Sequence, residues 1–162
     1  MDELLRPVVV SAGLGALVGL IRQWGDQNSS DPGEFAGLRT HTFWAVLGCL
    51  GAYVSGNHVP YTLLAILVVV PAHLIAQAAN QHDRSQPGST SFAGAVITML
   101  CGALVYWGET RAAILVAALA MVVLGSKQPI HSWARALTAE DIRATLQFAA
   151  ISGVILPLVP DQ

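Results

Sequence analysis

The sequence predicts an all-α protein, a polytopic transmembrane helix bundle of about six short spans. Hydrophobic residues form 54% of the 162 residues and charged residues only 11%, whereas a soluble domain usually carries about 25% charge. The apolar stretches are apolar all round, while a water-facing helix shows a polar stripe. Tryptophan and tyrosine gather near the ends of these stretches, which is typical of side chains at the headgroup level.

We expect one integral membrane domain over residues 1–162, because this length suits a single domain. The expected spans are residues 7–21, 41–56, 61–79, 91–107, 112–125 and 139–156. Several are shorter than the roughly 20 residues that a perpendicular helix needs, and the fifth is the shortest. The first is preceded by Asp2 and Glu3 and has no basic region before it, so we expect it to be retained rather than cleaved as a signal peptide.

The later spans carry recognisable local signals. Pro71 interrupts the third span, and a Pro-Gly-Ser-Thr-Ser run at 87–91 opens the fourth. Thr138 followed by Asp141 fits a capping box at the start of the sixth. Prolines at 157 and 160 end that span.

Lys and Arg are unequally divided between the two faces that alternate spans define. One face holds Arg22, Arg39, Arg84, Lys127, Arg135 and Arg143, and the other holds Arg6 and Arg111. The richer face should be cytoplasmic. Both termini are therefore expected on the non-cytoplasmic side. The expected location is a bacterial-type inner (plasma) membrane, which the chain crosses several times.

Small residues recur at intervals of four, which places each set on one helix face where backbones can approach closely. The expected helix-packing residues are Gly15, Gly19, Gly48, Gly56, Gly94 and Gly102. The same faces are equally suited to a contact between subunits.

Two groups of polar residues lie at or inside the apolar stretches. The first, Arg22, Arg39, Thr40 and His41, is a candidate ligand site or pore mouth; positive-inside charge and interfacial anchoring are the alternative. The second, His73, Gln77, Thr90 and Ser91, is a candidate path lining; its alternative is interhelical hydrogen bonding and helix capping.

Several function classes find no support in the sequence. The ten Asp and Glu residues all lie outside the apolar cores, so no carboxylate site for a divalent cation and no other metal site is expected. Cys49 and Cys101 both fall in apolar stretches and match no zinc pattern. We expect no cofactor, no nucleic-acid partner because no basic run is present, and no enzymatic activity because no nucleophile–base pair or phosphate loop is visible.

Residues 15–22 (GALVGLIR) and 36–42 (AGLRTHT) resemble the N-terminal signature of the MgtC/SapB family of membrane proteins. Residues 88–93, 125–127 and 156–161 resemble the longer branch of that family, in which this domain is fused to a second membrane domain of unknown function. The chain ends where that second domain would continue. It departs from the family at Ile21, which usually is Glu, and near Phe92, where the longer branch usually has Glu.

The resemblance implies a link to magnesium-limited growth and virulence, and to the control of other membrane machines such as the ATP synthase. The expected function is a transport or ion-homeostasis subunit that acts as an oligomer. The alternative is a non-transporting regulator that binds another membrane complex through its small-residue helix faces. The expected partners are the lipid bilayer and either a second copy of the chain or a separately encoded membrane protein.

Overall fold

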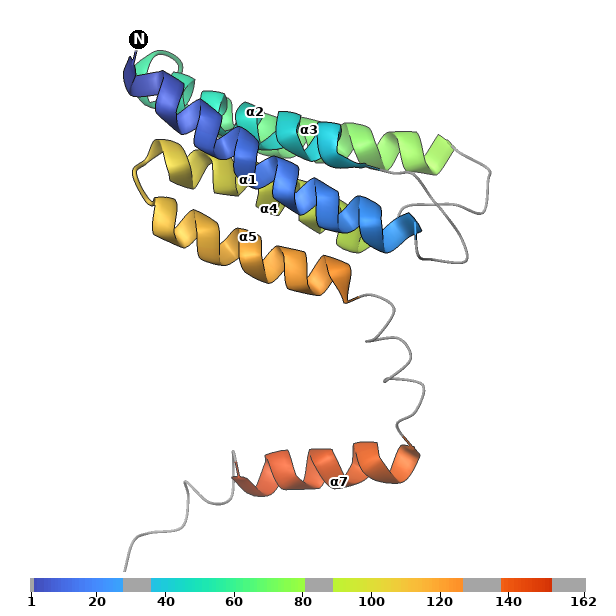
Figure 1. Cartoon of the computed structure of the whole chain (residues 1–162). Helices are drawn as coiled ribbons and strands as arrows, with labels where there is room; N and C mark the ends of the chain where they lie inside the picture. Colours follow the sequence, from blue (N-terminus) through green and yellow to red (C-terminus); the bar gives the residue numbers. More distant parts are fainter. Residues whose placement is uncertain (1, 28–35, 81–88, 127–137, 153–162) are drawn as a thin grey trace, which may run out of the picture. The chain divides into compact units, whose positions relative to one another are not determined.

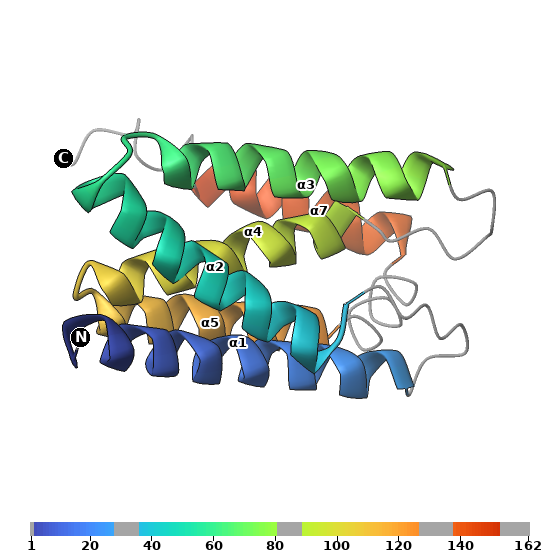
Figure 2. The same cartoon turned by 90° about the horizontal axis from the view of Figure 1, so that it is seen from above.

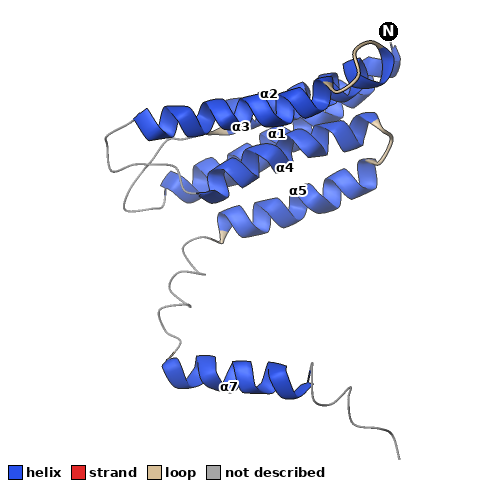
Figure 3. Cartoon of the chain, turned by 180° about the vertical axis from the view of Figure 1, so that it is seen from behind, coloured by secondary structure: helices blue, strands red, loops and turns tan. Residues whose placement is uncertain are grey.

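A computed structural model describes residues 2–27, 36–80, 89–126 and 138–152 of the chain. Within these ranges every regular element is a helix, as Figure 3 shows. The helices are α1 (Asp2–Gln27), α2 (Leu38–Asn57), α3 (Thr62–Asn80), α4 (Ser89–Tyr106), α5 (Thr110–Gly125) and α7 (Ala139–Ala150). The all-α fold class is therefore confirmed. The chain divides into two compact units, Met1–Lys127 and Gln128–Gln162.

The first unit is a bundle of α1 to α5 in which consecutive helices run in opposite directions (Figure 1). Helix α2 packs most extensively against α1 and α4, and α5 packs against α1 and α4. Helix α3 contacts α2 and α4 less extensively and runs along one side of the bundle in Figure 2. The alternation brings the end of α1 and the starts of α2 and α4 to the same end of the bundle.

Glycine allows α2 and α4 to cross with their backbones in contact. A Cβ placed on Gly48 of α2 would overlap the carbonyl oxygen of Met99 in α4. A Cβ on Gly102 of α4 would overlap the carbonyl oxygen of Ala45 in α2. Because there is no room for a side chain at either position, only glycine allows α2 and α4 to come this close.

The core of the bundle is built from small and sulfur-containing residues around these crossings. Ala45, Cys49, Ala95 and Met99 are completely buried. Cys101 and Val18 join α4 to α1, and Ala113 and Ala117 of α5 pack against them. Both cysteines are free thiols, which agrees with their expected place inside apolar helices.

Two of the described helices are long and apolar enough to cross a membrane, by length and composition: Glu3–Gly25 within α1 and Thr62–Ala79 within α3. Thr90–Tyr106 and Thr110–Gly125 are shorter apolar helices. The 20-residue α2, which begins with Leu38, Arg39, Thr40 and His41, is not among these four.

Helix α7 differs from the expected sixth span. It has 12 residues, about 18 Å at a rise of about 1.5 Å per residue, and its described side chains are exposed. The capping box at its start is confirmed. The Thr138 hydroxyl accepts a hydrogen bond from the Asp141 backbone N–H at 3.2 Å, and the Asp141 carboxylate accepts one from the Thr138 N–H at 2.9 Å. Residues 153–156 of the expected span lie outside the described residues.

Candidate functional site

Arg22 and Ser91 meet inside the bundle, at the end where α1 finishes and α4 begins. The Arg22 Nη2 donates a hydrogen bond to the Ser91 Oγ at 2.8 Å, and the two residues are only 8% and 7% exposed. A charged group is costly to bury unless hydrogen bonds compensate its lost hydration. The sequence assigned Arg22 to a pore mouth and Ser91 to a path; the structure joins them in one buried contact between α1 and α4.

His41 lies beside this contact and is fully buried. Its Nδ1 is 3.2 Å from the carbonyl oxygen of Gly37. Its ring meets Trp44 edge-on, with 4.9 Å between the ring centroids. The His41 Nε2 has no hydrogen-bond partner among the described residues. The imidazole is therefore anchored to the start of its own helix, in surroundings that disfavour a charge.

Helix α1 covers His41 through two glycines. A Cβ on Gly15 would overlap the His41 carbonyl oxygen. A Cβ on Gly19 would lie 2.7 Å from the Cα of Leu38 and 3.0 Å from the Cβ of His41. The glycines of the 15–22 segment and the histidine of the 36–42 segment thus form a single helix crossing.

The start of α2 also receives a side chain that the sequence analysis did not single out. The Leu38 backbone N–H donates to the Oε1 of Gln23 at 3.4 Å. Gly37 occupies the N-cap and supplies no side-chain acceptor. Gln23 follows directly after Arg22, but the sequence carries no signal that would pair it with a helix 15 residues further on.

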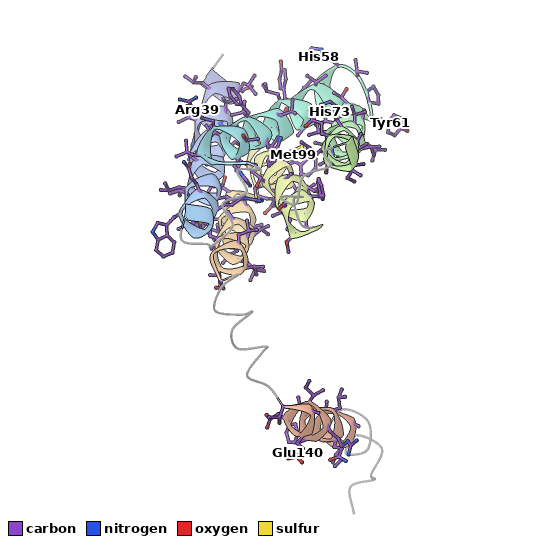
Figure 4. The ribbon with its side chains drawn as sticks, turned by 90° about the vertical axis from the view of Figure 1, so that its right-hand side faces the viewer. Arg39, His58, Tyr61, His73, Met99 and Glu140 are labelled. Carbon is purple, nitrogen blue, oxygen red and sulfur yellow. The ribbon has the colours of Figure 1, made fainter. Side chains whose placement is uncertain are left out.

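The four residues proposed for the pore mouth do not converge. Arg39 is exposed, and Figure 4 shows it at the periphery of the bundle. Thr40 is half-buried, while Arg22 and His41 are buried. Of the four residues, Arg22 and His41 thus lie inside the bundle, and Arg39 lies outside it.

The residues proposed for a path also lie apart. His73 and Gln77 are exposed on α3, where the Gln77 Nε2 and the His73 Nε2 are 2.9 Å apart. Thr90 is exposed, whereas its neighbour Ser91 is buried against Arg22. Within the described bundle these four side chains do not line one interior passage.

The six glycines assigned to packing occupy different environments. Gly15, Gly19, Gly48 and Gly102 lie where another helix leaves no room for a Cβ. A Cβ on Gly94 would make an ordinary contact, 3.6 Å from the Leu124 side chain, and one on Gly56 would meet nothing within 4 Å. The packing contact expected at Gly56 is therefore absent from the described part of the chain.

The opposite end of the bundle carries a second polar contact, which the sequence analysis missed. The Asn57 Nδ2 donates to the Tyr106 hydroxyl at 2.7 Å and to the Tyr53 carbonyl oxygen at 2.8 Å. The Tyr53 ring meets the Tyr106 ring edge-on, with 5.7 Å between centroids. The tyrosines were recognised as residues at span ends, but Asn57 lies beyond the expected end of its span.

The described residues offer no cluster of three or more His, Cys, Asp or Glu side chains that could hold a metal ion. An apolar groove of about 490 Å³ runs along α1, between Leu38 and Ile114. A cavity of about 570 Å³ near Glu3, Arg6 and Tyr106 lies at the other end. Neither cavity is lined by a site residue that the sequence predicted.

A protein-family model described as MgtC family matches residues 8–133 of the chain. No match was found among curated proteins or among solved structures. The matched range includes the glycines of α1, the start of α2 with His41, and all of α3 to α5.

Proposed function

Because the chain belongs to the MgtC family, we propose that this membrane protein is a subunit of magnesium transport or homeostasis that acts as an oligomer. The family gives the link to magnesium. The observation that carries the oligomeric part is the closure of the bundle's centre, where Gly48 and Gly102 place the α2 and α4 backbones in contact. A route for an ion therefore has to form between chains rather than through the middle of one described bundle.

The chemistry of the buried polar groups supports this proposal. Mg²⁺ prefers oxygen ligands in near-octahedral geometry and gives up its waters reluctantly. The buried polar side chains are Ser11, Arg22, His41, Ser91 and Thr98, and none of them is a carboxylate. A dehydrated magnesium ion held inside one bundle is therefore disfavoured, whereas a hydrated ion between chains remains compatible with this composition.

The proposal is tested by magnesium flux into liposomes that contain the purified chain and an enclosed magnesium indicator. We expect flux that rises faster than linearly with the number of chains per liposome, because more than one chain forms the route. The control is Gly48→Leu, which removes the α2–α4 crossing and should abolish flux. Absence of magnesium flux at every chain density would contradict the transport role.

A non-transporting regulator is the second candidate, and one observation favours it. The close glycine contacts lie within the chain, but large apolar side chains of α5 such as Leu115, Leu119 and Val122 are 64–71% exposed. A membrane partner would then use an outer face of α5 rather than the small-residue faces. Recovery of a stoichiometric membrane partner from mild detergent, together with no flux, would favour this candidate over the first.

We further propose a bacterial-type inner membrane location, with the Arg22 end of the bundle in the cytoplasm. Among the described residues of the first unit the cations divide evenly, Arg22 and Arg39 at one end and Arg6 and Arg111 at the other. The excess expected from the sequence therefore depends on Arg84, Lys127 and Arg135, which lie outside the described residues, and on Arg143 in α7. Labelling of single cysteines placed at Thr90 and at Glu109 from each side of the membrane tests the orientation.

A further inference from the structure

A cavity of about 570 Å³ lies at the end of the first unit where α1 and α5 begin (Figure 1). Its charged lining residues are Glu3 and Arg6 of α1, while Pro7, Val10 and Val105 give it an apolar part. Both charged side chains are exposed, and neither forms an ion pair with another described residue. The cavity therefore offers an accessible cation and an accessible anion beside apolar surface.

An apolar groove of about 490 Å³ continues from this cavity along α1. Val10 lines both the cavity and the groove, and the lining residues on α1 extend to Leu20. Gly13 lies in the groove, where a Cβ placed on it would meet nothing within 4 Å. The other lining residues are all aliphatic. The groove therefore suits a hydrocarbon chain, which needs apolar surroundings and no hydrogen bonds.

The cavity and the groove share one face of α1. Residues at alternating intervals of three and four positions run along this face: Glu3, Arg6, Val10, Gly13, Leu17 and Leu20. That spacing keeps side chains on one side of a helix. From Val10 to Leu20 the helix rises about 15 Å, which is half of a hydrocarbon core about 30 Å thick. The face thus carries charged groups first and then apolar surface to the depth of one leaflet.

The charged residues of the cavity match the two charges of a zwitterionic headgroup. The guanidinium of Arg6 can bond a phosphate through paired N–H groups. Thr110, the first residue of α5, also lines the cavity, and a helix N-terminus favours negative charge. The carboxylate of Glu3 can accept hydrogen bonds from an ammonium group. Because Glu3 and Arg6 together are neutral, a zwitterionic headgroup fits this lining better than an anionic one.

From the charged cavity and the apolar groove on one face of α1, we propose that the chain binds one phospholipid with an ethanolamine headgroup. Arg6 holds the phosphate, Glu3 holds the ammonium, and an acyl chain lies in the groove between α1 and Ile114 of α5. Ethanolamine is preferred to choline because a trimethylated nitrogen has no N–H to donate to Glu3. This site does not depend on the proposed magnesium role.

The first experiment is native mass spectrometry of the chain released from liposomes with equal amounts of phosphatidylethanolamine, phosphatidylcholine and phosphatidylglycerol. We expect the chain to retain mainly phosphatidylethanolamine. Glu3→Gln should lower the preference for ethanolamine over choline about tenfold, because a hydrogen bond between two charged groups is lost. Arg6→Gln should lower the retention of all three phospholipids and leave the ratio of ethanolamine to choline lipid as it was.

Glu109→Gln and Arg111→Gln are the matched controls for these charges. Both residues are exposed at the same end of the bundle, and neither lines the cavity, so neither substitution should alter the retained lipid. Equal retention of the three phospholipids by the unmodified chain would overturn the proposal. A loss of preference in Glu109→Gln as large as that in Glu3→Gln would also overturn it, because any charge at this end would then serve.

The second experiment fills the groove. Gly13→Phe places a ring where the acyl chain would lie and should release most of the bound phospholipid. Gly56→Phe is the control, since a Cβ on that glycine also meets nothing within 4 Å and Gly56 does not line the groove. Unchanged helical circular dichroism shows that both variants have folded. Undiminished lipid retention in Gly13→Phe would overturn the proposal.

A protein helix in the groove is the competing occupant. A benzophenone attached to Leu17→Cys, inside the groove, should crosslink to phospholipid in native membranes. Native Cys49 and Cys101 are buried and react little with the label. Crosslinking to protein alone would overturn the lipid site.

Discussion

Helices α2 and α3 are neighbours in the bundle, and the less apolar of the two, α2, is the more buried. Helix α2 carries Arg39 and His41 and is the only one of α1 to α5 that is neither a candidate span nor a shorter apolar helix, yet seven of its residues are buried. Helix α3 is long and apolar enough to span, and 6% of its apolar window is buried. Figure 4 shows Met99 among the helices, whereas His73 of α3 is exposed.

This comparison shows that the central helix of the bundle is the one with small residues at its contacts, not the most hydrophobic one. In water the most apolar helix would be covered first. In a bilayer, lipid tails are as apolar as leucine, so close packing and hydrogen bonds decide which helix is central. Helix α2 is central because Gly48, Gly51 and Ala52 allow close approach, and α3 faces outward because its bulky side chains are compatible with lipid.

The largest effect is expected where α2 is closest to its neighbour. Gly48→Ala should destabilise the bundle by about 3 kcal/mol, at the upper end for overpacking, because the new Cβ would overlap the Met99 carbonyl oxygen. The measurement is unfolding by sodium dodecyl sulfate titration in mixed micelles. Gly56→Ala in the same helix is the control; with open space around it, we expect a gain of about 0.5–1 kcal/mol. Equal effects of the two substitutions would contradict the close α2–α4 crossing.

The two histidines compare the helices directly. His41→Ala should cost about 2 kcal/mol of bundle stability, because it leaves a cavity beneath α1 and removes the contact with Trp44. His73→Ala should change the unfolding free energy of the monomer by less than about 0.5 kcal/mol, since His73 is exposed. Dilute detergent keeps the chains apart for both measurements. A His73 variant as unstable as the His41 variant would place α3 inside the fold.

The sequence predicted much of this arrangement, but it did not show which polar side chains face the interior of the bundle and which face outward. Spacing of four placed Gly15, Gly19, Gly48 and Gly102 on helix faces, and the crossings occur there. His41 and His73 look alike in sequence, each a polar residue in an apolar stretch. They differ only in the direction that each side chain takes from its helix axis. A helix that is apolar all round has no polar stripe to show which side faces the interior.

The buried contact between α1 and α4 gave a similar lesson. Arg22 and Ser91 were both singled out, yet they were assigned to separate roles because they are 69 positions apart in the sequence. Thr90 and Ser91 are adjacent hydroxyl residues, and one faces outward while the other faces Arg22. A pairing between two distant helices depends on how they pack, which a single sequence does not state.

An intermediate effect is expected for this contact. Ser91→Ala should lower the bundle's unfolding free energy by about 1.5–3 kcal/mol, the range for a buried hydrogen bond to a charged group. Thr90→Ala, one residue earlier and exposed, should have an effect within about 0.5 kcal/mol. The same titration in mixed micelles measures both. Comparable losses for the two hydroxyls would mean that the Arg22 contact contributes nothing to stability.

A smaller effect is expected at the far end of α2. Tyr106→Phe removes the hydroxyl that accepts from Asn57 but keeps the ring against Tyr53. A neutral, partly exposed hydrogen bond contributes about 0.5–1.5 kcal/mol. Tyr61→Phe is the matched control, because that residue is 77% exposed and should show no change. A loss for Tyr61→Phe as large as that for Tyr106→Phe would indicate a general effect of removing interfacial hydroxyls.

The smallest effect is expected in α7. The described side chains of this helix are exposed, so its stability depends on its own hydrogen bonds, including those of the capping box. Hydrogen bonds from the side chain and the backbone N–H of Thr138 lower the pKa of Asp141. Because this pKa is lower in the helix than in the unfolded segment, the carboxylate supports the helix above the unfolded pKa, about 3.9. That support is lost as the pH falls through the lower, folded value.

Backbone chemical shifts of residues 138–143 should therefore move toward coil values only below about pH 4. Asp141→Ala should show those coil-like shifts at neutral pH, whereas Glu140→Ala, which leaves the capping box intact, should not. Helical shifts that persist in Asp141→Ala would show that α7 is held by contacts other than its own cap.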